Sequence, residues 1–161
     1  MAFPQKSFTL EEAKKRMERY CAFQERSHQE VVQKLRQMRM IPEAIDAIVV
    51  GLIESGFLSE ERFALAFSRG KFHQKGWGRV RIRKALEQRN LSEYLIQKAL
   101  DEIPEQEYLR AFHALAETRW GQLARETDVQ KKKRKFADYF FYRGWEMELV
   151  HDKIKVLERN P

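Results

Sequence analysis

The residues best suited to chemistry in this sequence are the cations of one stretch, RGKFHQKGWGRVRIRKAL, at residues 69–86. Guanidinium and ammonium groups bind phosphates and carboxylates, and the stretch itself contains no acid. Residues 62–89 hold nine bases and one acid, whereas the rest of the chain holds 22 bases and 23 acids. Charge concentrated in this way predicts a binding site for a polyanion or an acidic protein surface. Its candidate residues are Arg69, Lys71, Lys75, Arg79, Arg81, Arg83 and Lys84.

A second basic block, KKKRK, follows at residues 131–135. For any single lysine, a solvated helix face is the simpler explanation. The density of charge in the two blocks favours a binding function for them as groups. We therefore add the second block to the candidate surface: Lys131, Lys132, Lys133, Arg134 and Lys135.

Trp77 lies within the first basic stretch and has two interpretations. If Gly78 is the N-cap of a helix, Trp77 is placed to pack on Ile82 as a hydrophobic staple. Alternatively, the indole is an exposed anchor among cations, as aromatic residues are on nucleic-acid-binding and protein-binding surfaces. The two roles are compatible if one face of the ring is buried, and we retain Trp77 as a candidate binding residue.

The helix that follows Gly78 has a narrow apolar stripe. At 100° per residue, Arg79 and Arg83 fall on one flank of this helix and Arg81 falls on the other, with Lys84 facing away. A helix surrounded by cations in this way suits a groove that presents negative charge on more than one side.

No pattern in the sequence predicts catalysis. Gly70, Gly76 and Gly78 fit neither phosphate-binding glycine motif, and the four histidines are scattered without metal-ligand spacing. Cys21 has apolar neighbours and is best explained as a small core residue. We therefore expect no enzymatic activity, no catalytic residue, no metal and no cofactor.

The elements that must position the cations are helices. Thr9 with Glu12, and Ser27 with Glu30, have the spacing of capping boxes, and Gly56 is suited to a left-handed helix end. No alternating apolar and polar run persists as a strand requires. The sequence therefore predicts nine helices, at about 10–26, 28–39, 42–55, 60–74, 79–89, 92–102, 105–125, 128–142 and 146–158.

Self-similarity groups these helices into three repeats. KLRQMRMIPEAI at 34–45 aligns with KALEQRNLSEYL at 84–95 at an offset of 50, and FADYFFYRGWEMEL forms a third copy 54 residues later. Arg39, Arg89 and Arg143 then share one position at the end of the second helix, where a cation stabilises the helix dipole. We expect an all-α fold of three tandem three-helix repeats in an elongated, curved body. The predicted repeats are 1–58, 59–103 (the basic one) and 104–161.

Composition restricts the setting of the protein. Among the 161 residues there is one cysteine, which excludes an internal disulfide framework. The longest uncharged apolar run, residues 47–53, is too short to cross a bilayer. The start, MAFPQKSFTLEE, lacks the apolar core of a secretory signal. We expect no membrane partner and a soluble, reducing, cytoplasmic setting.

The second repeat resembles the middle repeat of the RecX family. The resemblance rests on SEERFALAFSRGKFHQKGWGRVRIRKALEQRNLS at 59–92, with an acid-x-RFA opening at 60–64, KGWG at 75–78, and Arg81-Ile82 followed by Leu86. The first repeat, with SHQEVVQKL and ESGFLSEERF, is of the same kind. The third matches mainly in its apolar pattern, so the resemblance covers nearly the whole chain.

The resemblance implies a bacterial regulator without an active site. RecX-like proteins lie in the helical groove of the RecA–DNA filament, limit its extension, and depress its ATP hydrolysis and strand exchange. A basic middle repeat would meet acidic protein surface and DNA phosphates in such a groove. We therefore expect a monomer whose partner is the RecA filament, with single- or double-stranded DNA as a second candidate partner.

Two other functions fit the same residues. A helical DNA-binding protein would place these cations directly on phosphates, and a helical scaffold would place them on some other acidic protein. The charge pattern supports a polyanion or an acidic partner in general. RecA as that partner follows from the resemblance alone.

Overall fold

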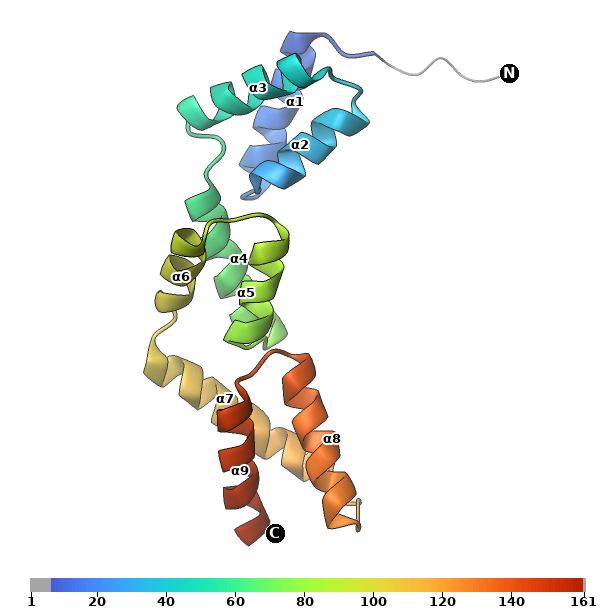
Figure 1. Ribbon diagram of the computed structural model, residues 1–161, viewed down its shortest axis with the longest axis vertical. Coiled ribbons are helices and arrows are strands. Elements are labelled where there is room, and N and C mark those ends of the chain that lie inside the picture. Colours follow the sequence, from blue (N-terminus) through green and yellow to red (C-terminus); the bar gives the residue numbers. More distant parts are fainter. Residues whose placement is uncertain (1–6, 161) are drawn as a thin grey trace, which may run out of the picture.

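The computed structural model describes residues 7–160 as an elongated, gently curved stack of three helical units (Figure 1). Each unit contains three consecutive helices, and the described residues form no strand. The predicted all-α fold of tandem three-helix repeats is therefore confirmed. The helices are α1 (Leu10–Phe23), α2 (His28–Gln37), α3 (Pro42–Glu54), α4 (Glu60–Lys75), α5 (Arg79–Gln88), α6 (Glu93–Asp101), α7 (Glu105–Gln122), α8 (Val129–Tyr142) and α9 (Met147–Arg159).

The first unit, α1–α3, has a core of its own. Thr9 accepts a hydrogen bond from the Glu12 N–H at 3.1 Å, and Glu12 accepts one from the Thr9 N–H at 3.3 Å, so the predicted capping box begins α1. Ser27 and Glu30 form the same box at the start of α2. The buried apolar residues of this core are Ala13, Met17, Cys21, Val31, Leu35, Met38, Ile45, Ile48, Leu52 and Leu58.

The second unit, α4–α6, and the third unit, α7–α9, share one continuous core. Ile82 and Leu86 enter it from α5, and Phe136 and Phe140 enter it from α8, all four fully buried. The spacing of four residues places both side chains of each pair on one face of their helix. Each of these two units therefore buries apolar surface on the other. The apolar core of the first unit is separate from theirs.

Charged and polar side chains join the first unit to the second. Arg62, near the start of α4, donates a hydrogen bond to the carbonyl oxygen of Gly56 in the first unit at 2.7 Å. Three side-chain pairs cross this boundary, and we call them the polar joint: Arg62–Glu25 at 2.9 Å, His28–Glu60 at 3.4 Å and Arg89–Glu30 at 3.6 Å.

The ends of the second helices correct the predicted repeat alignment by one residue. Helices α2, α5 and α8 are each followed by a C-cap residue and then by a residue with positive φ. These left-handed residues are Arg39 (61°), Asn90 (61°) and Gly144 (84°). The structural offset between the first two repeats is therefore 51 rather than 50, whereas the offset of 54 between the second and third is confirmed.

This shift also corrects the predicted role of one arginine. Arg89 donates to the carbonyl oxygen of Ala85 at 3.0 Å, and Arg143 donates to that of Tyr139 at 3.2 Å, so both cap the ends of their helices as predicted. Arg39 is exposed in the left-handed position one residue further on. Its predicted equivalence to Arg89 was wrong, because Arg39 occupies the left-handed position that Asn90 has in the second unit.

Candidate partner-binding surface

The KGWG turn at residues 75–78 lies where the second and third units meet. Gly76 ends α4 with φ 68°, and Gly78 is the N-cap of α5, as predicted. The N–H of Gly78 donates to the carbonyl oxygen of Arg143 at 2.8 Å. A Cβ on Gly78 would lie 2.4 Å from the carbonyl oxygen of Gly144, so only glycine permits this approach. We call the two turns in contact, residues 76–78 and 143–146, the glycine joint.

Polar side chains fix the glycine joint in one arrangement. The indole N–H of Trp145 donates to the carbonyl oxygen of Gly76 at 3.0 Å. The buried hydroxyl of Tyr108 accepts from the Arg79 N–H at 3.0 Å and donates to the Glu146 carboxylate at 2.6 Å. Burial, together with the hydrogen bond to Glu146, raises the pKa of Tyr108 above its ordinary value, so the hydroxyl stays protonated. The start of α5 is thereby held against the third unit.

Trp77 is half-buried at the edge of the shared core. Its ring lies edge-on to Phe67, with 6.3 Å between centroids, and Ile82, the predicted staple partner, is a buried member of the same core. The Arg81 guanidinium lies 4.0 Å from the Trp77 ring centroid, and the Lys71 ammonium lies 4.8 Å from it. Trp77 therefore contributes to packing and carries two cations, while its contact with a partner stays a prediction.

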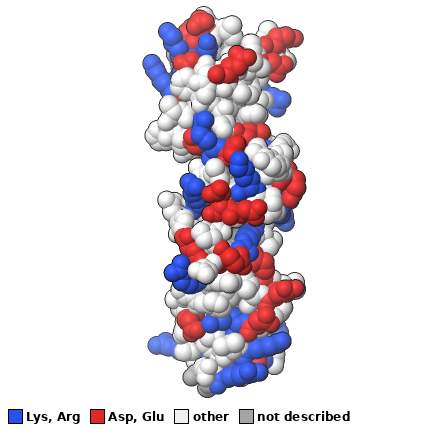
Figure 2. Space-filling model, turned by 90° about the vertical axis from the view of Figure 1, so that its left-hand side faces the viewer, with Lys and Arg blue, Asp and Glu red and all other residues white. Residues whose placement is uncertain are grey.

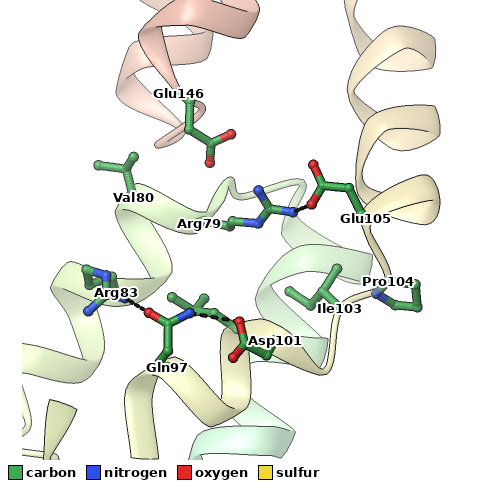
Figure 3. A pocket seen from close by; sticks show the side chains of 10 residues that line it. Arg79, Val80, Arg83, Gln97, Asp101, Ile103, Pro104, Glu105 and Glu146 are labelled. Carbon is green, nitrogen blue, oxygen red and sulfur yellow. Dashed lines mark hydrogen bonds and ion pairs between the residues drawn. The ribbon is translucent and has the colours of Figure 1, made fainter. Parts of the chain in front are cut away.

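One flank of α5 is neutralised by acids of the same chain (Figure 3). Arg79 is ion-paired with Glu105, and Arg83 is ion-paired with Glu93 at 2.6 Å. Arg83 also donates to the side-chain oxygen of Gln97 at 2.7 Å. Figure 3 shows Arg79 and Arg83 lining a pocket together with residues of α6 and the segment that leads into α7.

Arg69 is also paired with an acid of the same chain, since its guanidinium lies 3.8 Å from the Glu102 carboxylate. The neutralising carboxylates come after the basic stretch in the sequence and lie beside it only in the folded chain. Counting charges within the stretch therefore omits them. Figure 2 shows acidic and basic side chains intermixed over the middle of the molecule. The absence of acids within the stretch therefore does not leave its charge uncompensated, because Arg69, Arg79 and Arg83 are paired with acids from elsewhere in the chain.

The remaining cations of the stretch have no carboxylate within 4.0 Å among the described residues. Arg81 faces Trp77 from the flank opposite Arg79 and Arg83, in agreement with the predicted helical geometry. Lys71 lies over Trp77, and the other two are exposed. The unpaired members of the predicted site are thus Lys71, Lys75, Arg81 and Lys84.

The second basic block is also partly neutralised. Two of its side chains form ion pairs: Lys133 with Glu158 at 2.6 Å, and Lys135 with Glu126 at 3.3 Å. The Lys132 ammonium lies 4.2 Å from the Trp120 ring, whereas Lys131 and Arg134 are exposed and have no carboxylate within 4.0 Å in the described part of the chain. Figure 2 shows basic side chains gathered at the end of the molecule that the third unit forms. The block lies at the opposite end of α8 from the glycine joint, so the two blocks do not merge.

Aromatic residues of the third unit that the predicted site omits lie beside Arg81. The Arg81 guanidinium lies 4.8 Å from the Tyr142 ring and donates to the Tyr142 carbonyl oxygen at 3.3 Å. Arg143 lies 3.6 Å from the Tyr139 ring. The available signal was YFFYRGW at 139–145, in which an arginine follows a cluster of rings. The apolar repeat pattern explains only the buried members of that run.

The described residues show neither a metal-binding cluster nor an activated thiol. Within residues 7–160, no group of three His, Cys, Asp or Glu side chains is placed to hold a metal ion. Burial raises the pKa of the Cys21 thiol, which suits a core residue better than a nucleophile. No helix in the described range is long and apolar enough to span a membrane.

The fold and these surfaces define a helical-repeat protein that presents unpaired cations on its second and third units. Models of the second and third three-helix domains of RecX match residues 59–100 and 105–154. Several curated RecX proteins also match most of the chain. The chain belongs to the RecX family of regulatory proteins.

Individual RecX proteins resemble this chain in sequence and in fold. The regulatory protein RecX of Pseudomonas savastanoi pv. phaseolicola is 35% identical over 131 residues, covering 80% of this chain and 81% of that protein. The regulatory protein RecX of Salmonella typhimurium is 30% identical over 162 aligned residues, covering 88% and 87%. The crystal structure of RecX from Lactobacillus salivarius superposes with a TM-score of 0.78 at 18% identity, covering 92% of this chain and 96% of that one. The structural likeness supports the helical-repeat fold.

Proposed function

We propose that this chain is a negative regulator of the RecA recombinase. It binds in the groove of the RecA–DNA filament and limits the extension, ATP hydrolysis and strand exchange of that filament. Membership of the RecX family carries the proposal. The elongated three-unit body and its unpaired cations support it, because a filament groove is long and lined with negative charge. In this proposal the chain has no catalytic activity and acts by occupying the groove.

The exposed unpaired cations are the principal partner-binding residues of the proposal. A free ammonium or guanidinium meets a partner anion without first losing an internal ion pair. Arg69, Arg79 and Arg83 contribute less, because each would exchange one carboxylate for another. The principal residues are therefore Lys75 and Lys84 of the second unit and Lys131 and Arg134 of the third.

The activity is tested by ATP hydrolysis of RecA on single-stranded DNA at low salt. We expect a substoichiometric amount of this chain to slow hydrolysis, and we expect strand exchange under the same conditions to stop. Unchanged hydrolysis with a several-fold molar excess of the chain over its cognate RecA would overturn the proposal.

The role of the unpaired cations is tested by two quadruple variants of equal charge. One variant replaces the exposed unpaired residues by glutamine: Lys75, Lys84, Lys131 and Arg134. The other replaces four ion-paired residues by glutamine: Arg69, Lys98, Lys133 and Lys135. We expect the first variant to lose most inhibition of RecA and the second to retain most of it. Equal loss in both would show that net charge alone matters and would contradict the assignment.

A further inference from the structure

A row of alternating cations and aromatic rings runs from the second unit into the third, across the glycine joint. Half of its members belong to the first basic stretch, and the other half belong to neither basic block. Three of its members come from the segment 71–81 and three from the segment 139–143. In order along the row they are Lys71, Trp77, Arg81, Tyr142, Arg143 and Tyr139.

The distances make the row continuous. The Arg81 guanidinium bridges the units, since it lies 4.0 Å from the Trp77 ring centroid and 4.8 Å from that of Tyr142. Arg143 continues the row, lying 5.9 Å from the Tyr142 ring and 3.6 Å from the Tyr139 ring. All of these separations are within the range of cation–π attraction.

The cations of the row form no ion pair with the described part of the chain. Among the described residues, Lys71, Arg81 and Arg143 have no carboxylate within 4.0 Å, in contrast to Arg79 and Arg83 on the other flank. Arg81 and Arg143 each use one N–H on a backbone carbonyl oxygen. A guanidinium has five N–H donors, so the others remain for an anion.

Tyr142 supplies the open ring of the row. Tyr142 is 71% exposed, whereas Trp77 is half-buried and has two cations over its ring. An exposed aromatic side chain between two unneutralised guanidinium groups can stack a planar group while the cations hold its charged neighbours.

This chemistry selects among anionic partners. An acidic protein surface would satisfy the cations, but its carboxylates give Tyr142 no aromatic face on which to stack. A DNA duplex offers phosphates, but its bases are stacked on one another inside the helix. A single strand offers both phosphates and free base faces, and cations alternating with rings are the usual means of binding it.

We propose that the row binds single-stranded nucleic acid directly, with a base stacked on Tyr142 and phosphates held by Lys71, Arg81 and Arg143. The proposal goes beyond the regulation of RecA, because it assigns the chain an affinity for a bare strand. The second and third units then bind the strand together, since the glycine joint fixes the two halves of the row relative to each other.

The test measures fluorescence anisotropy of a labelled oligothymidine of about 20 nucleotides, without RecA. We expect the parent chain to bind the strand more tightly than a duplex of the same length. Replacing an aromatic side chain that stacks a base costs roughly five- to a hundredfold in affinity, so Tyr142→Ala is expected to weaken binding by at least about fivefold. Tyr142→Phe keeps the ring and is expected to bind like the parent.

Tyr94 provides the matched control. It is an equally exposed tyrosine (72%) on α6 and is not part of the row. Tyr94→Ala is expected to leave strand binding unchanged, and circular dichroism verifies that both alanine variants remain helical. Lys71→Gln should flatten the slope of log affinity against log salt by about 0.7 if Lys71 meets one phosphate.

Three results would overturn the inference: no binding of the strand at low salt, equal affinity for strand and duplex, or equal effects of Tyr142→Ala and Tyr94→Ala. RecA hydrolysis assays run in parallel separate this inference from the proposed function. If the chain slows RecA but does not bind the bare strand, the inference fails and the proposed function stands. If the chain binds the strand but leaves RecA unaffected, the inference stands and the proposed function fails.

Discussion

The two joints between the units are built from different chemistry. In the glycine joint, the Gly78 N–H donates to one backbone carbonyl of the third unit and the Val80 N–H donates to another, above a shared apolar core. The polar joint consists of partly exposed side-chain pairs, and the cores on its two sides are separate. Exposed ion pairs contribute about 0–1 kcal/mol each, whereas buried contacts across a core contribute far more.

This difference divides the molecule mechanically. We expect the second and third units to move as one body, because separating them would expose aromatic core and break backbone hydrogen bonds. The first unit keeps its own core when its contacts with the second are lost. The cation–aromatic row crosses the glycine joint, so we expect its geometry to be set before a partner binds. We expect the first unit to change its orientation more readily, because its core is separate.

The largest effect is expected from Gly78→Ala in the glycine joint. The added Cβ would lie 2.4 Å from the Gly144 carbonyl oxygen and 2.7 Å from the Trp145 Cα. Backbone atoms cannot rotate away as a side chain can, so the two turns must separate. We expect a loss of about 3 kcal/mol in the free energy of unfolding, at the upper end of the usual cost of overpacking. Urea denaturation followed by circular dichroism measures it.

Gly70→Ala is the matched control for that variant. Gly70 lies inside α4, and a Cβ there would have no atom within 4 Å beyond its own surroundings in the helix. Alanine is favoured over glycine in a helix by about 0.5–1 kcal/mol, so this variant should be slightly more stable than the parent. A similar loss in both variants would show that the close approach at Gly78 does not determine the strength of the joint.

A smaller effect is expected from Tyr108→Phe in the same joint. The variant keeps the ring but removes the hydroxyl that accepts from the Arg79 N–H and donates to Glu146. Leaving such buried groups without a partner costs about 1–3 kcal/mol. Thermal unfolding at pH 7 measures the loss. A melting temperature equal to that of the parent would show that water replaces the hydroxyl at no cost.

Tyr108 also predicts a dependence of stability on alkaline pH. Its pKa in the folded chain is raised above the ordinary value of about 10, so above that pH the folded state retains a proton that the unfolded state loses. The stabilising contribution of Tyr108 is complete below about pH 10 and declines as the pH rises toward the folded pKa. We therefore expect the stability difference between the parent and Tyr108→Phe to be constant near neutral pH and to shrink in alkaline solution. A difference that grows would contradict the assignment.

The helices and the buried faces of this fold could be predicted from the sequence because their signals are local. Capping boxes such as Thr9 with Glu12 lie within one turn, and core pairs such as Ile82 with Leu86 recur at helical spacing. The position of Gly78 as a helix N-cap was available for the same reason.

The candidate site was less predictable because its electrostatics depend on segments distant in sequence. Glu105 lies 26 residues from Arg79 and neutralises it, and Tyr142 lies 61 residues from Arg81 and contacts it. No local count of charge reveals either contact. The close approach of Gly78 to Gly144 is equally absent from any local pattern, since each glycine alone indicates only a turn. Long-range packing therefore decided which cations of the basic stretch remain unpaired.

The smallest effect is expected from Arg62→Gln in the polar joint. The change removes the ion pair with Glu25 at 2.9 Å and the hydrogen bond to the Gly56 carbonyl oxygen. The Arg62 side chain is 47% exposed, so its pair is screened by solvent, and we expect a loss below about 1 kcal/mol. Because salt screens such pairs, the difference from the parent should shrink as ionic strength rises.

Combining Arg62→Gln with Glu25→Gln in a double-mutant cycle isolates the coupling between the two side chains. A coupling as large as the loss in Gly78→Ala would show that the polar joint is as strong as the glycine joint, and the division of the molecule into a mobile first unit and a rigid remainder would then be wrong.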